Sequence, residues 1–220
     1  MNFALAIPDS DFQLSPYLEQ ICDELTVYGY KFEISDRLKA DTTVRKAFVK
    51  DDSLGKLIAL AYRPRTGPMQ KLRIKLEVDT NPPSGATYNM PFLDYPFPAA
   101  VRVFDLPSLF AGKLHALLCR SYLKGRDWYD FIGYTARRTS INHELLSCAL
   151  RQQGPWKGQS LHSDNAWCTA QLSAMITKID WLQAQRDVER FIKTHELPSL
   201  KIWSREYFLQ QCNKLNESQN

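Results

Sequence analysis

The chain has 220 residues, of which 44% are hydrophobic and 24% are charged, and its formal net charge at pH 7 is +4. This composition is typical of a soluble globular protein, and no apolar run approaches the ~20 residues that a membrane-spanning helix needs. The first residues, MNFALAIPDSD, have neither the basic start nor the small-residue cleavage site of a secretory signal peptide.

The front of the chain predicts several strands and one helix. Alternating apolar residues predict strands at 2–6, 30–34, 44–49, 72–78 and 101–104. Ser15 and Pro16 open a helix that continues to about Tyr28 and is ended by Gly29. The apolar run 57–61 is ambiguous between strand and helix. The proline-rich stretch 80–98 is a long loop, and a loop of that length in a compact domain is usually functional or mobile.

The strand at 72–78 has two different faces. Its apolar face carries Leu72, Ile74, Leu76 and Val78, and its charged face carries Arg73, Lys75, Glu77 and Asp79. The apolar face predicts continuous core. The charged face fits either a sheet edge over a cleft or an ordinary solvent face with cross-strand ion pairs.

A helix follows from Asp105, which is a good N-cap, with Pro107 in the first turn. Its apolar stripe is predicted to contain Leu106, Leu109, Phe110, Leu114 and Leu117. Lys113 projects from the margin of this stripe, either as a lysine that reaches solvent from a core edge or as a functional cation. Gly112 weakens the helix and predicts that another group approaches its backbone closely.

A second helix is predicted to begin near Gly125. Asp127 and Asp130 are three residues apart and therefore share one helical face, with Arg126 on its flank. Capping of the helix N-terminus alone would explain Asp127, but it explains Asp130 less well. Helical periodicity then continues to the end of the chain, in 142–150, 165–179, 181–192 and 204–215. The predicted organisation is an α/β core at 1–104 and a helical region at 105–220.

The cysteines and histidines that could bind a metal are dispersed along the chain, whereas the basic residues form clusters. The five cysteines are widely spaced and form no CxxC pair, so they predict reduced thiols in a cytoplasmic protein. His115 and Cys119 are four residues apart on one helix, but no second pair completes a zinc site. Basic residues cluster in two stretches, 63–75 and 113–126, which fits either a solvated surface or contact with nucleic acid.

Three segments together resemble a known family. RIKLEVDTNPP, VFDLPSLFAGKLHALLCR and KGRDWYDF, in this order, are similar to the AbiE-type nucleotidyltransferase toxins of type IV abortive-infection systems. The resemblance covers most of residues 1–135. It implies an α+β fold with a polymerase-β-like nucleotidyltransferase core, built on a mixed sheet with helices, followed by a C-terminal helical region.

The resemblance also implies an activity and its residues. Members bind a nucleoside triphosphate with Mg²⁺, in some cases transfer nucleotides to tRNA, and are neutralised by a cognate antitoxin. Lys75 and Asp79 match the family's strand motif, with Glu77 beside Asp79 as a further expected metal ligand. Lys113 matches its helix lysine, and the RDxxD element consists of Arg126, Asp127 and Asp130. The expected catalytic residues are Lys113, Asp127 and Asp130. Lys75, Lys113 and Arg126 are expected to bind the nucleotide.

Two carboxylates remain open in role, because Asp127 and Asp130 could orient Lys113 or Arg126, or act directly. The first family motif, a G-G-(S/T) segment followed by D-x-D, is expected to be incomplete here, with Asn2 in the place of its second aspartate. Asparagine is neutral and is therefore a poorer Mg²⁺ ligand than aspartate.

Three interpretations follow for function. The chain could be a fragment of an active toxin, a catalytically inactive homologue that binds nucleotide, RNA or antitoxin, or an interaction module that shares only the fold. The strand at 2–6 is also predicted to lie at an exposed sheet edge, which would favour self-association.

Overall fold

The computed structural model describes residues 2–29, 31–36, 53–62, 70–95 and 97–217. It divides the chain into two compact units, Met1–Pro82 and Pro83–Asn220. Each unit has its own hydrophobic core. The predicted boundary between residues 104 and 105 falls inside the second unit. Residues before Asp105 group with the helices there, because the Thr87 amide donates to the Ser108 Oγ at 2.9 Å and the Asp105 amide donates to the Thr87 carbonyl at 3.1 Å.

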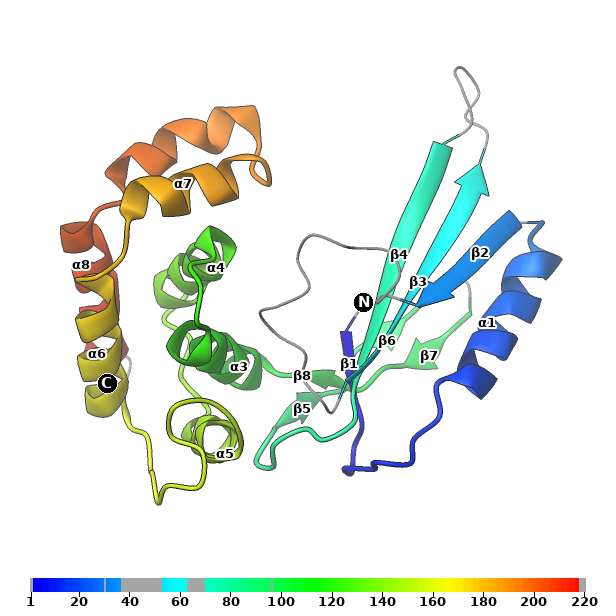
Figure 1. Cartoon of the computed structure of the whole chain (residues 1–220), viewed down its shortest axis with the longest axis horizontal. Helices are drawn as coiled ribbons and strands as arrows, with labels where there is room; N and C mark the ends of the chain where they lie inside the picture. Colours follow the sequence, from blue (N-terminus) through cyan, green and yellow to red (C-terminus); the bar gives the residue numbers. More distant parts are fainter. Residues whose placement is uncertain (1, 30, 37–52, 63–69, 96, 218–220) are drawn as a thin grey trace. The chain divides into compact units, whose positions relative to one another are not determined.

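The first unit contains a four-stranded sheet with the strand order β1-β4-β3-β2 (Figure 1). Its elements are β1 (Asn2–Ala4), α1 (Ser15–Val27), β2 (Lys31–Asp36), β3 (Ser53–Tyr62) and β4 (Gln70–Asp79). Strand β1 is parallel to β4, whereas β2, β3 and β4 are antiparallel neighbours. Within the described residues, β1 is thus an edge strand. The ambiguous run 57–61 belongs to β3, and the predicted strand 44–49 lies outside the described residues.

Helix α1 has the ends that the sequence predicts. Ser15 begins it, a proline lies in its first turn, and Gly29 follows with a φ of 75°, a left-handed conformation that glycine adopts without strain. The Gly29 amide donates to the Thr26 carbonyl at 2.9 Å. This turn returns the chain to the sheet.

The core of the first unit joins α1 to one face of the sheet. Its buried side chains are Leu14, Leu18, Ile58, Leu76 and Val78. The alternation predicted for β4 is confirmed at Leu76 and Val78, which are buried, and at Lys75, which is exposed. The expectation that Leu72 is core is wrong, since that side chain is 52% exposed. Among the β4 residues whose burial is described, Ile74, Leu76 and Val78 belong to the core cluster.

The second unit contains four short strands and a set of helices (Figure 1). Its elements are β5 (Tyr88–Asn89), β6 (Phe92–Leu93), β7 (Ala99–Ala100), β8 (Val103–Phe104), α3 (Leu106–Cys119), α4 (Gly125–Ala136), α5 (His143–Gln152), α6 (Asn165–Ile176), α7 (Trp181–Glu189), the 3-10 helix η1 (Thr194–Ile202) and α8 (Arg205–Glu217). Strand β5 pairs with β8, and β6 pairs with β7. All four predicted C-terminal helices are confirmed. The periodicity does not predict η1, which contains Pro198.

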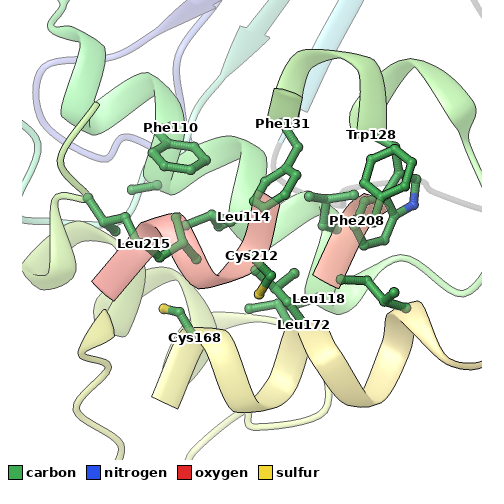
Figure 2. Close-up of a cluster of buried hydrophobic side chains, with 14 of the residues drawn as sticks. Phe110, Leu114, Leu118, Trp128, Phe131, Cys168, Leu172, Phe208, Cys212 and Leu215 are labelled. Carbon is green, nitrogen blue, oxygen red and sulfur yellow. The ribbon is translucent and has the colours of Figure 1, made fainter. Parts of the chain in front are cut away.

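The core of the second unit joins its helices (Figure 2). Phe110 and Leu114 of α3, Trp128 and Phe131 of α4, and Phe208 of α8 are all buried there. Leu106 and Leu109 were expected in the same stripe, but they are 49% and 44% exposed. The buried face of α3 instead runs through Phe110, Leu114 and the C-terminal turn, because α3 packs against α4, α5 and α6 along those residues.

The chain is therefore an α+β protein, as predicted. None of the helices in the described part of the chain combines the length and the apolar character that a bilayer crossing demands.

Candidate functional site

Helix α3 positions Lys113. The Asp105 side chain caps the helix by accepting a hydrogen bond from the Ser108 amide at 2.9 Å. Burial tends to raise the pKa of Asp105, but hydrogen bonds from Thr87 and Ser108 outweigh this and lower the pKa. Because the cap fixes where the helix starts and Leu114 fixes its buried face, Lys113 must leave α3 beside the core. The Lys113 side chain is 23% exposed.

Helix α4 begins where α7 crosses closely. A Cβ added to Gly125 would collide with the backbone carbonyl oxygen of Ala184, so only glycine fits at this position. The Gly125 amide donates to Asp187 Oδ2 at 2.8 Å, which satisfies one of the donors that a helix N-terminus leaves unpaired. The close packing against α7 therefore explains why the KGRDWYDF segment has a glycine at position 125. At Gly112, by contrast, nothing in the described part of the chain lies within 4 Å of an added Cβ, so the expected close approach is not found among those residues.

Three of the predicted site residues come together in an ion-pair cluster between α3 and α4. Lys113 Nζ lies 2.9 Å from Asp127 Oδ1 and 2.7 Å from Asp130 Oδ2. The Asp127 side chain is only 4% exposed, whereas that of Asp130 is 43% exposed. Asp127 lies in the first turn of α4, where a carboxylate is favourable, and its Oδ1 accepts a hydrogen bond from Lys113. Both carboxylates thus contact Lys113, and their roles stay predictions.

Arg120 is a fourth member of this cluster that motif reasoning did not single out. Its Nε lies 3.4 Å from Asp127 Oδ2, and its side chain is 16% exposed. One of its terminal nitrogens donates to the Tyr122 hydroxyl at 3.0 Å. The signal was present in the sequence, because Arg120 follows Lys113 by seven residues, which is two helical turns and returns to the same face. Asp127 is thus held between two cations.

The charges around Lys113 favour its protonated form. Burial tends to lower the pKa of Lys113, but the hydrogen bonds and charges of Asp130 and Asp127 outweigh it and raise the pKa. Nearby Lys124 behaves in the opposite way. Burial lowers its pKa, and the positive charges of Arg120, Arg126 and Lys113 add to this effect against the opposing charge of Asp127. The two cations and two carboxylates of the cluster balance in charge, and Lys124 adds a positive charge nearby.

Arg126 points to a different partner. Its guanidinium lies over the ring of Phe191, 4.6 Å from the ring centroid. The guanidinium of Arg190 lies 4.7 Å from the same ring. Arg126 is therefore close to the Lys113 cluster in the sequence, but its side chain is placed by the end of α7.

The remaining predicted residues lie in the first unit, on the charged face of β4. Lys75 Nζ and Glu77 Oε2 form an ion pair at 3.1 Å. Asp79 ends the strand, and its Oδ1 accepts from the Asn81 amide at 3.2 Å. In the parallel pair, Asn2 is opposite Glu77 and Ala4 is opposite Asp79. Asn2 and Glu77 therefore share one face of the sheet with Asp79.

This face of β4 offers oxygen atoms of the kind that Mg²⁺ prefers. Mg²⁺ in nucleotide enzymes is commonly bound by one or two carboxylates together with substrate phosphates, and Asp79 and Glu77 fit that donor set. Among the described residues, no group of three histidine, cysteine or acidic side chains is arranged for a metal ion. A Mg²⁺ ion held by Asp79 and Glu77 would therefore need phosphate oxygens of the substrate to complete its coordination.

His115 and Cys119 of α3 and Cys168 of α6 have structural surroundings. Both His115 Nε2, at 3.4 Å, and Cys119 Sγ, at 3.8 Å, face the Gln153 carbonyl oxygen, so this pair has a local structural partner. The cysteines in the structure are free thiols. Burial raises the pKa of Cys119 to about 11 and that of Cys168 to about 12. These two thiols are therefore poor nucleophiles.

Comparison with known families gives one match. The family model for "Nucleotidyl transferase AbiEii toxin, Type IV TA system" matches residues 3–211. The matched range includes the β4 residues and the Lys113 cluster. Comparisons with curated proteins and with solved structures gave no match.

Proposed function

The chain belongs to the AbiEii family of nucleotidyl transferase toxins of type IV toxin–antitoxin systems, and we propose that it transfers a nucleotide from a nucleoside triphosphate to an RNA acceptor. A tRNA is the first acceptor to test. A cognate antitoxin would neutralise the activity, and the system would act in the cytoplasm in phage defence.

The observation that carries this proposal is the oriented lysine. An ammonium group has three N–H donors, and Asp127 and Asp130 engage two of those of Lys113. One donor is left for a phosphate oxygen. Because the pKa of Lys113 is raised, the group stays protonated and can neutralise negative charge that develops as the triphosphate is cleaved.

The two aspartates divide the work of holding this lysine. Asp127 is buried and is itself held by Arg120, so it acts as a positioning residue. Asp130 is nearly half exposed, and it can exchange Lys113 for solvent or substrate at little cost. This difference supports a fixed lysine position with one adaptable partner.

The β4 carboxylates support a metal role in the first unit. Asp79 and Glu77 would hold Mg²⁺, which when bound would neutralise the charge of the triphosphate and orient it for in-line displacement at the α-phosphorus. Lys75 lies next to Glu77 and would contact phosphate or balance the carboxylate. Asn2 would contribute at most a neutral amide oxygen on the same face.

The test is transfer of each α-labelled nucleotide to total tRNA with Mg²⁺. We expect label on RNA with the parent chain and a loss of about 100-fold or more with Lys113→Ala, as for removal of an electrostatic stabiliser. Arg205→Ala, an exposed cation on α8, is the matched control and should transfer like the parent. Equal transfer by the parent and Lys113→Ala would refute the role of the lysine.

A second function is favoured by Asn2. Because Asn2 replaces an expected carboxylate opposite Glu77, the chain could bind nucleotide, RNA or antitoxin without catalysis. Folded parent protein that transfers no label, but binds a nucleoside triphosphate in equilibrium dialysis, would support this alternative. Restoring the carboxylate with Asn2→Asp should then increase transfer.

Self-association through the β1 edge stays a prediction. Light scattering at high protein concentration tests it, and a monomer under those conditions would contradict it.

A further inference from the structure

We propose that the end of α7 forms a binding surface for single-stranded RNA, with the Phe191 ring as a stacking platform for a base and Arg190 and Arg126 as phosphate contacts. This inference rests on the proposed function, because it assigns the acceptor RNA to a surface of the second unit.

The first observation is the state of the ring. Phe191 is 51% exposed and lies just after α7. The guanidinium groups of Arg126 and Arg190 lie 4.6 and 4.7 Å from its centroid. An exposed aromatic ring between cations is the combination that sequence-tolerant single-strand binders use, since every base has a stackable face and every nucleotide brings a negative charge.

The second observation is that these groups are held in place. Asp187 Oδ2 accepts from the Gly125 amide at 2.8 Å, and Asp187 Oδ1 lies 3.4 Å from a terminal nitrogen of Arg190. One carboxylate therefore fixes the start of α4, and with it Arg126, to the last turn of α7. Ala184 also approaches Gly125 closely at this junction. The start of α4, which carries Arg126, is thus joined to the last turn of α7, next to Arg190 and Phe191.

The third observation is the continuity of positive charge. Lys124 precedes Arg126 by two residues at the start of α4, and the charges of Arg126 and Lys113 both act on it. Lys193, two residues after Phe191, is exposed as well. An RNA strand stacked on Phe191 would meet cations along the way to the lysine that we expect to bind the triphosphate. Charge complementarity therefore favours RNA as the occupant.

The experiment measures RNA affinity directly. A fluorescent single-stranded RNA of about 12 nucleotides, within the site sizes of known single-strand binders, is titrated with the full chain in the absence of nucleotide. We expect Phe191→Ala to raise the Kd by about 5- to 150-fold, the range measured for loss of one base–aromatic stack. Phe191→Trp should bind at least as tightly as the parent, because it keeps the stacking face.

Matched controls separate stacking from general damage. Leu182→Ala removes an exposed apolar side chain of α7, 64% exposed, and should leave the Kd unchanged. Arg190→Gln should weaken binding and reduce the slope of log K against log salt by about 0.7, as expected for one lost phosphate contact on a single strand. Arg205→Gln should not change that slope.

The outcomes decide between this surface and the proposed function. A Kd unchanged in Phe191→Ala, or raised equally by Leu182→Ala, would overturn the surface. The surface would also be overturned if the Phe191 and Arg190 variants bound RNA normally but were no longer neutralised by an acidic antitoxin, because it would then bind a protein partner. RNA binding that depends on Phe191, in a chain that transfers no nucleotide, would refute the transferase proposal and leave the surface standing.

Discussion

The substitution Asp127→Asn tests how Lys113 is held. Asparagine has nearly the same shape as aspartate and can still accept a hydrogen bond from Lys113, so the change removes the negative charge and little else. In the parent, Asp127 lies 2.9 Å from Lys113 Nζ and 3.4 Å from Arg120 Nε, and its side chain is 4% exposed. The variant therefore leaves two mostly buried cations facing a neutral amide.

The expected cost follows from that environment. Removing one partner of a buried ion pair costs about 3–5 kcal/mol. Lys113 keeps Asp130 at 2.7 Å, and Arg120 keeps the Tyr122 hydroxyl, so we expect a cost at or below the bottom of this range, about 2–3 kcal/mol. For a chain of this size that corresponds to a fall in Tm of about 5–10 °C.

Asp130→Asn is the matched comparison. Because Asp130 is 43% exposed, solvent screens its ion pair, and the loss should be about 0–1 kcal/mol. Thermal unfolding followed by circular dichroism near neutral pH measures both variants, and nucleotide transfer to RNA measures their activity. We expect both to lose activity but only Asp127→Asn to lose much stability. A Tm for Asp127→Asn equal to or above that of Asp130→Asn would refute the reasoning.

Three further predictions concern protonation and packing. Because the pKa of Lys113 is raised above its ordinary value of 10.5, its ion pairs stabilise the fold fully below that pH and are lost as the pH rises through the raised value. The free energy of unfolding of the parent, measured against Lys113→Met, should therefore decline only at alkaline pH; a decline near neutrality would contradict this. Gly125→Ala should destabilise the second unit by more than about 2 kcal/mol, because its methyl group would collide with the Ala184 carbonyl. Gly112→Ala, in open space on α3, should stabilise it by up to about 1 kcal/mol in urea unfolding, and the opposite order of the two variants would refute the packing argument. Alkylation of native protein near pH 8 should spare Cys168, whose pKa is raised to about 12 by burial, until denaturant is added, and rapid modification in the native state would show that the site opens.

The sequence predicts the parts of the site that follow from the periodicity of a single helix or strand. The spacing of Asp127 and Asp130 predicts one shared helical face, and both contact Lys113. The same holds for β4, where alternation separates Lys75 from the buried Leu76. These relations are local, so a single segment of sequence contains them.

What the sequence could not anticipate depends on partners that lie far along the chain. Leu109 fits the apolar stripe of α3, yet it is exposed, because the packing of other helices decides which face is covered. The close approach expected at Gly112 occurs instead at Gly125, where α7 crosses. Likewise, no local pattern around Arg126 indicates that its guanidinium lies over Phe191, some 65 residues later in the chain.

The aromatic contacts of Trp128 have a genetic consequence. Its ring, next to Asp127 in the chain, packs edge-on against Trp181 and Phe208, with centroids 5.3 and 5.4 Å away. Figure 2 shows Trp128 beside Phe208. A nonsense or frameshift mutation after codon 130 and before codon 208 would remove the α8 side of this packing and expose the tryptophan, although every residue of the Lys113 cluster would still be encoded. Escape mutants selected against the toxin should therefore map to the last third of the gene as readily as to the codons of the cluster itself.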